Sequence, residues 1–116
     1  MSLKGQATLL RVFVGETDRL DGKPLYERIL LLARERGLAG ATVLRGVASY
    51  GASSLLHTAK VLRLSEDLPL VIEIVDSTEV VAAFLPELDA ALERAGQGGL
   101  VTLEKVDVIR FTPHSS

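Results

Sequence analysis

The sequence predicts an α+β domain with a four-stranded antiparallel sheet and two helices on one face. Three observations support this prediction: four segments have the composition or alternation of strands, two have helical spacing, and they follow one another as strand, helix, strand, strand, helix, strand. The 116 residues are 47% hydrophobic, which is enough for one packed core. We therefore expect a single domain over residues 1–116, with flexible ends at 1–6 and 112–116.

The first strand and the first helix occupy the N-terminal third of the chain. Residues 7–14 alternate, and one face carries Thr8, Leu10, Val12 and Val14. A polar loop over 15–23 follows. Pro24 then suits the first turn of a helix, because its missing N–H would have no partner there. Gly37 is a natural residue just beyond the C-terminal end of that helix.

The middle of the chain predicts two strands joined by a polar loop. Residues 40–50 form the second strand, in which Gly46 indicates a bulge or a close approach by another backbone. A loop rich in glycine and serine covers residues 51–59, and residues 60–64 extend the strand. Residues 68–75, dense in Val and Ile, form the third strand.

The second helix and the fourth strand complete the order. Residues 76–79 (Asp-Ser-Thr-Glu) have the pattern of a capping box with a carboxylate at each end. Pro86 removes one helical hydrogen bond, so we expect a kink or a restarted helix beside it. Residues 96–99 (Gly-Gln-Gly-Gly) lead into the fourth strand at 100–111. With right-handed crossovers, this β-α-β-β-α-β order gives the ferredoxin-like arrangement.

The uncovered face of this sheet is apolar for a face exposed to water. It is expected to carry Leu9, Phe13, Val43, Val47, Val71 and Val75, interrupted by Arg11, Arg45 and Glu73. Ordinary exposed valines explain part of this pattern, but burial against other subunits explains it better. At about 25 cal/mol per Å², hiding several such side chains contributes several kcal/mol. The three charged residues are expected to pair across the subunit interface, since unpaired charges are costly there.

The composition excludes several classes of function. The absence of cysteine excludes disulfides, thiolate metal sites and thiol catalysis. A net charge of −2 and an aromatic content of 4% argue against nucleic-acid binding. The sequence has no apolar run long enough to span a membrane and no signal-peptide pattern, so we expect a cytoplasmic protein without direct membrane insertion.

Four stretches give the chain a resemblance to the PII-like family of domain of unknown function 190. They are residues 40–46 (Gly-Ala-Thr-Val-Leu-Arg-Gly) with Tyr50 and Gly51 after them, 53–60 (Ser-Ser-Leu-Leu-His-Thr-Ala-Lys), 67–76 (Asp-Leu-Pro-Leu-Val-Ile-Glu-Ile-Val-Asp) and 98–104 (Gly-Gly-Leu-Val-Thr-Leu-Glu). The resemblance runs from Leu9 to Phe111. It implies a ferredoxin-like fold, a homotrimer and kinship with nitrogen-regulatory PII signalling proteins, which bind adenine nucleotides between subunits and dock a long loop on a target.

The resemblance implies a regulatory protein, not an enzyme, with ATP, ADP or AMP as effector and a target protein such as a membrane transporter. Its ligand contacts would include Thr42, Gly46, Tyr50, Gly51, Gly96, Gly98, Gly99 and Arg110. The PII glycine loop carries a lysine where this chain has Leu100, and the glutamine at the base of the PII loop has no counterpart. A different nucleotide or small anion therefore remains an alternative ligand.

Within the loop over residues 51–68, through which signalling is expected, residues 51–60 are the best functional candidate in their own right. Lys60 suits contact with phosphate, and Ser53, Ser54 and His57 are expected to contact a partner. A flexible surface hairpin is the alternative interpretation. His57 lacks the companions that a metal site needs, and neither serine has a visible base, so we expect no metal site and no catalytic residue.

The glycine-rich residues 96–99 are also open to two interpretations. They can expose backbone N–H groups to an anion, or they can end a helix and turn tightly into a strand. Two other functions share the same fold. One is a small oligomeric enzyme, and the other is an amino-acid-sensing module of the ACT type, which would pair its sheets side by side in dimers.

Overall fold

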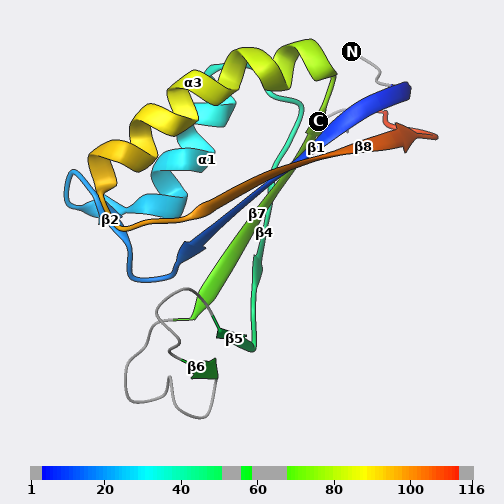
Figure 1. Ribbon diagram of the computed structural model, residues 1–116. Helices are drawn as coiled ribbons and strands as arrows, with labels where there is room; N and C mark the ends of the chain where they lie inside the picture. Colours follow the sequence, from blue (N-terminus) through cyan, green and yellow to red (C-terminus); the bar gives the residue numbers. More distant parts are fainter. Residues whose placement is uncertain (1–3, 51–55, 59–67, 113–116) are drawn as a thin grey trace.

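The computed structural model describes residues 4–50, 56–58 and 68–112. Its main sheet has the strand order β4-β7-β1-β8, and all neighbouring strands are antiparallel. These strands are β1 (Gly5–Gly15), β4 (Thr42–Arg45), β7 (Pro69–Asp76) and β8 (Leu100–Val108). Helices α1 (Leu25–Glu35) and α3 (Thr78–Ala95) both cover one face of the sheet (Figure 1). The predicted ferredoxin-like fold is confirmed.

Two small hairpins flank this sheet. One pairs β2 (Arg19–Leu20) with β3 (Lys23–Pro24). The sequence predicts a loop up to residue 23 and Pro24 in the first helical turn, but Pro24 ends this hairpin and is the N-cap of the helix that begins at Leu25. The other pairs β5 (Ala48–Tyr50) with β6 (Leu56–Thr58) and lies where the chain leaves the main sheet beyond β4 (Figure 1). The expected strand over residues 40–50 is therefore divided into β4 and β5.

The core lies between the sheet and the two helices. Alternate residues of β1 and β7 point toward the helices, and the helices contribute one apolar stripe each. The central members of this core are Leu10, Val12, Ile72, Ile74, Leu25, Ile29, Phe84 and Leu88. Because β1 has a strand on each side, its helix-facing row is buried from Thr8 to Val14.

The start of α3 differs from the expected capping box. Ser77 is the N-cap, and its Oγ accepts a hydrogen bond from the N–H of Val80 at 3.2 Å. Asp76 is only 1% exposed and does not cap this helix in the expected way. Its carboxylate accepts from the N–H of Ser77 at 2.7 Å and from the N–H of Ala39 at 2.8 Å. Asp76 therefore ties the segment after α1 to the end of β7.

Pro86 does not restart the helix. Helix α3 runs as one element from Thr78 to Ala95 with Pro86 inside it. Both Pro86 and Ala82, the residue whose carbonyl loses its helical partner, are exposed. Water can therefore satisfy that carbonyl, which makes the proline tolerable at this position.

The uncovered sheet face carries a different set of β4 residues from the expected one. Val43 pairs with the buried Ile72 and packs against the core, so Thr42 and Leu44 face outward. Arg45 shares its register with the buried Leu70, so it too lies on the helix side. A shift of one residue in a strand reverses every side chain. Val47 lies beyond β4 and is 77% exposed.

The charged residues of the sheet pair within one protomer, contrary to the expectation that they pair between subunits. Arg11 donates to Glu73 at 3.0 Å and to Glu104 at 2.8 Å. These hydrogen bonds raise the pKa of the Arg11 guanidinium above its ordinary value. Arg45 forms an ion pair with Glu16 at 2.9 Å. The uncovered face thus holds a charge cluster that is already satisfied, surrounded by apolar side chains.

Candidate functional site

The candidate site residues in the described part of the chain lie at the two opposite ends of the sheet. We call the end where β1 and β4 finish and β7 and β8 begin the loop end, since the connection over residues 46–68 leaves the sheet there. The other end, where β4 begins and β8 finishes, is the groove end. Gly46, Gly96, Gly98 and Gly99 lie at the loop end, and Arg110 lies at the groove end. Thr42 lies between the two ends, three residues before Arg45 in β4, and lines the groove.

Gly46 fixes the point where the long connection leaves the sheet. Its N–H donates to the carbonyl of Pro69 at 2.7 Å, which joins the start of the connection to its end. A Cβ on Gly46 would lie 2.8 Å from Cγ of Pro69. The structure shows a close approach at this glycine, but the nearest group is the side-chain ring of the proline that starts β7 and not another backbone.

The three glycines after α3 have different structural reasons for being glycine. Gly96 is left-handed (φ 64°) and ends the helix, with its N–H donating to the carbonyl of Leu92 at 3.0 Å. A Cβ on Gly99 would lie 3.2 Å from the carbonyl oxygen of Phe13 in β1. Gly98 also has a positive φ (81°), but no atom lies within 4 Å of its Cβ direction. Gly98 therefore presents bare backbone to open space.

The segment after β1 connects the two halves of the loop end. The N–H of Glu16 donates to the carbonyl of Leu68 at 2.8 Å, at the return of the long connection. The N–H of Arg19 donates to Oε1 of Gln97 at 2.6 Å, in the glycine-rich loop. Residues 15–19 thus contact both loops that the sequence singles out.

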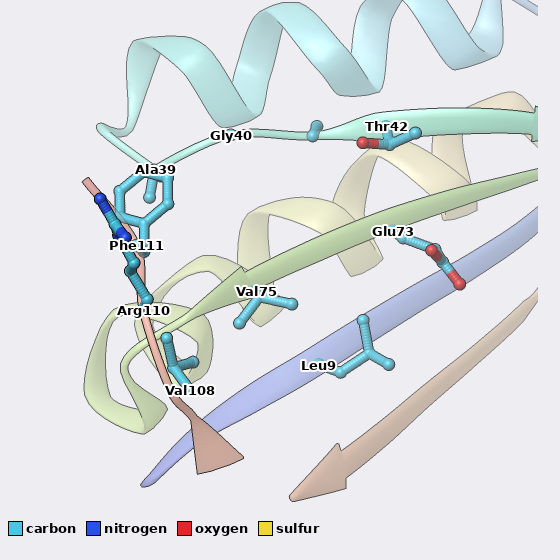
Figure 2. A pocket seen from close by; sticks show the side chains of 10 residues that line it. Leu9, Ala39, Gly40, Thr42, Glu73, Val75, Val108, Arg110 and Phe111 are labelled. Carbon is cyan, nitrogen blue, oxygen red and sulfur yellow. The ribbon is translucent and has the colours of Figure 1, made fainter. Parts of the chain in front are cut away.

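The groove end contains an open groove of about 540 Å³ on the uncovered face. Figure 2 shows Leu9 and Val75 on adjacent strands of its floor, with Arg110 and Phe111 beside Ala39 at one side. Thr42, Glu73 and Arg110 supply its polar side chains, and Glu73 accepts a hydrogen bond from Arg11 at 3.0 Å. Arg110 follows the last strand, which ends at Val108 and not at the expected Phe111.

The groove brings together two of the predicted ligand contacts, Thr42 and Arg110. Within the described residues, Arg110 has no acidic partner, so its guanidinium is available to an anion. An apolar floor with a few polar groups at its rim is typical of small-molecule sites. The groove therefore suits a ligand that has both an apolar or aromatic part and a negative charge.

The remaining predicted contacts belong to the connection itself. Tyr50 is the last residue of β5, and His57 pairs with Ser49 across the hairpin. Gly51, Ser53, Ser54 and Lys60 lie outside the described residues, and so does the expected strand extension at 60–64. These assignments stay predictions.

Sequence reasoning missed Glu16, Arg45 and Gln97 as members of the loop end. Arg45 and Glu16 are 29 positions apart in the sequence and Arg19 and Gln97 are 78 apart, so no local pattern pairs them. Over residues 4–50, 56–58 and 68–112 there is no group of three or more His, Cys, Asp or Glu side chains that could hold a metal ion. No described helix is long and apolar enough to cross a membrane.

Comparison with known families now places the chain. The model of the DUF190 family, described as "Uncharacterized ACR", matches residues 7–108. The chain belongs to the DUF190 family. This DUF190 chain is 43% identical over 101 residues to a UPF0166 protein of Aquifex aeolicus, covering 87% of this chain and 91% of that protein. It is 32% identical over 91 residues to a UPF0166 protein of Methanocaldococcus jannaschii, covering 78% and 83%.

Solved structures with the same fold include CPII, a nitrogen regulatory PII-like protein from Thiomonas intermedia K12. CPII bound to ADP, AMP and bicarbonate matches this DUF190 chain with a TM-score of 0.68 at 16% identity, over 89% of this chain and 88% of CPII. The apo form of CPII matches with a TM-score of 0.58, also at 16% identity, over 93% and 97%. At this identity the likeness establishes a shared fold.

Proposed function

We propose that this chain is a PII-like regulatory protein of the cytoplasm that binds an adenine nucleotide in clefts between the subunits of a homotrimer. Ligand binding at the base of the connection over residues 46–68 then alters how residues 51–68 dock on a target protein. The shared fold with CPII, whose structures carry ADP and AMP, supports the choice of nucleotide.

The distance between the two groups of candidate residues supports a cleft that is shared between two copies. β1 runs from Gly5 beside the groove end to Gly15 at the loop end. Ten steps of about 3.3 Å make this distance about 33 Å, which is longer than a mononucleotide. Arg110 and Gly98 of one protomer therefore cannot touch the same nucleotide. A complete site requires the loop end of one copy to meet the groove end of another.

The same separation also indicates how the copies assemble, namely into a closed ring. A contact between two different ends of the same chain is heterologous, and such contacts close into rings when the rotation allows it. The uncovered sheet face, with the half-buried Leu9, Phe13 and Val75 beside the charge cluster, supplies apolar surface for the contact. A trimer is the ring that we propose.

Titration calorimetry with ATP, ADP, AMP and cyclic nucleotides tests the proposal, with light scattering on the same samples. We expect a mass of three 12.5-kDa copies and binding of at least one adenine nucleotide. Gly98→Asn should weaken that binding about tenfold or more, because the new side chain fills the open space beside the backbone. Asparagine tolerates a positive φ better than most residues, so the substitution tests space more than strain.

Gly37→Asn is the matched control. Gly37 also has a positive φ (77°) and no atom within 4 Å of its Cβ direction, but it ends α1 on the helix side of the molecule. The affinity of the Gly37→Asn variant for nucleotide should equal that of the wild-type protein. A monomer that binds none of the nucleotides would refute the proposed function.

A further inference from the structure

Arg45 is an arginine whose donors are mostly unused. Only its Nη2 contacts an acidic group in the described part of the chain, namely Oε2 of Glu16 at 2.9 Å. The side chain is 61% exposed even though it lies at the end of a strand beside the core. Arg28 and Arg94 likewise contact Asp21 through Nη2 alone. Two other arginines engage more donors: Arg11 contacts two carboxylates through Nε and Nη1, and Arg36 contacts Glu87 through Nε and Nη2.

The Glu16 side of the pair is equally unsatisfied. Its Oε2 is shielded from solvent and has no partner with hydrogen-bond geometry among the described residues. The ion pair with Arg45 is therefore a contact of charges without the alignment that makes such pairs strong. An oxyanion that offers Arg45 two aligned oxygens would form a better complex than Glu16 does.

The position of the pair places it within the loop end. Glu16 follows Gly15, the last residue of β1, and the glycine-rich loop lies against the neighbouring Phe13 on the other side of the same strand. Adjacent strands are about 4.8 Å apart, and β7 and β1 lie between β4 and β8, so about 14 Å separates the backbone of β4 from that of β8. The Arg45 side chain spans part of this distance by reaching Glu16 after β1. The Arg45–Glu16 pair therefore lies on the β4 side of the loop end, beside the two ends of the long connection.

We propose that Arg45 is a phosphate-binding residue of the loop-end site, and that Glu16 competes with the bound phosphate for its guanidinium. This inference rests on the proposed function and specifies which part of the ligand is recognised there. The ligand class is a di- or triphosphate, free or esterified, and a nucleoside without phosphate gains nothing from Arg45. Glu16 holds the guanidinium in the absence of ligand and lowers the apparent affinity, because binding must first break the pair.

Opposite responses of the two partners test the proposal. Titration calorimetry is carried out with ADP, inorganic pyrophosphate and adenosine on the wild-type protein and on Arg45→Gln and Glu16→Gln. Arg45→Gln should lower the affinity for ADP and for pyrophosphate about tenfold or more, as loss of a charged hydrogen-bond donor does. Glu16→Gln should strengthen both by at least about threefold, because the competing charge is gone. The affinity for adenosine should be unchanged by either substitution.

Arg36→Gln and Glu87→Gln are the matched controls, since they break an exposed ion pair between α1 and α3. They should leave all three titrations unchanged. Should Glu16→Gln not fold, judged by circular dichroism, Glu16→Ala replaces it with the same expected sign. A Glu16 variant that weakens pyrophosphate, or an Arg45 variant that leaves it unchanged, overturns the proposal.

The titrations also separate this inference from the proposed function. Normal ADP binding with no response to either substitution refutes the role of Arg45 and leaves the regulatory function standing. Pyrophosphate binding that follows the expected pattern without any nucleotide binding refutes the nucleotide function and supports Arg45 as a phosphate contact. A wild-type protein that binds neither compound refutes both.

Discussion

At Gly46 a single missing side chain determines how the long connection begins. The residue both donates to the carbonyl of Pro69 and lies against its ring, so the two ends of the connection are held together at one point. The obstacle to a larger residue is the ring of a proline, which has little freedom to move aside. The loop end therefore depends on glycine here for space, not for an unusual φ.

Gly46→Ala should destabilise the protein by about 1–3 kcal/mol, the usual cost of overpacking a close contact. Urea denaturation followed by circular dichroism measures this difference. Gly40→Ala is the control, because no atom lies within 4 Å of a Cβ at Gly40 and its φ is not positive. Equal stability of the two variants would show that the Pro69 contact does not constrain position 46.

Among the elements, the two helices are joined by an exposed ion pair as well as by the core. Arg36, at the C-terminal end of α1, donates to both carboxylate oxygens of Glu87 in α3. The Arg36 hydrogen bond lowers the pKa of Glu87 below its ordinary value of 4.5, whereas partial desolvation opposes this shift. The folded protein therefore favours the ionised carboxylate.

The sign of this shift predicts a pH dependence. A lowered pKa in the folded state contributes stability above the ordinary pKa, and that contribution is lost as pH falls through the folded value. Glu87→Gln should therefore reduce stability at pH 7, and the difference from the wild-type protein should vanish as pH falls below 4.5 toward the folded pKa. Chemical denaturation at a series of pH values tests this, and a difference that grows on acidification would contradict it.

The order of helices and strands could be predicted from the sequence, because each element is specified by the pattern of its own residues. Alternation in residues 7–14 and the helical stripe after Ser77 each specify an element and a buried face. The sequence did not predict which side chains of β4 point toward the helices. A strand of four residues takes its register from β7 and not from its own pattern.

The candidate site was accessible only in part, for a similar reason. The glycines stand out locally, since few residues adopt a positive φ or tolerate such close contacts. The pairing of Glu16 with Arg45 depends on three strands coming together at one end of the sheet, which the sequence does not display.

For the molecule as a whole, the uncovered sheet face is the main surface without an internal partner. Its centre is the cluster of Arg11, Glu73 and Glu104, whose charges neutralise one another in part. Apolar residues surround this cluster: Leu9, Phe13, Leu44, Val71 and Val75. Because Arg11 pairs with both carboxylates, another copy can cover this centre at less cost than it could cover isolated charges, with one negative charge in excess.

Leu44→Lys should disrupt assembly, because it places a charge where the neighbouring copy is expected to pack. Light scattering should then report a mass near 12.5 kDa. Leu31→Lys is a close control, since Leu31 is 47% exposed and Leu44 is 48% exposed, but Leu31 lies on α1, away from this face. Loss of assembly in both variants, or in neither, would contradict the proposed interface.

The 33 Å between the two ends of β1 has a consequence for cells that make the protein. Under the proposed function neither end binds the nucleotide alone, so a single copy would not respond to it and the response would require assembly. Nucleotide held across the junction in turn keeps the copies together by mass action. The abundance of the chain would then tune its response as directly as the concentration of the nucleotide does.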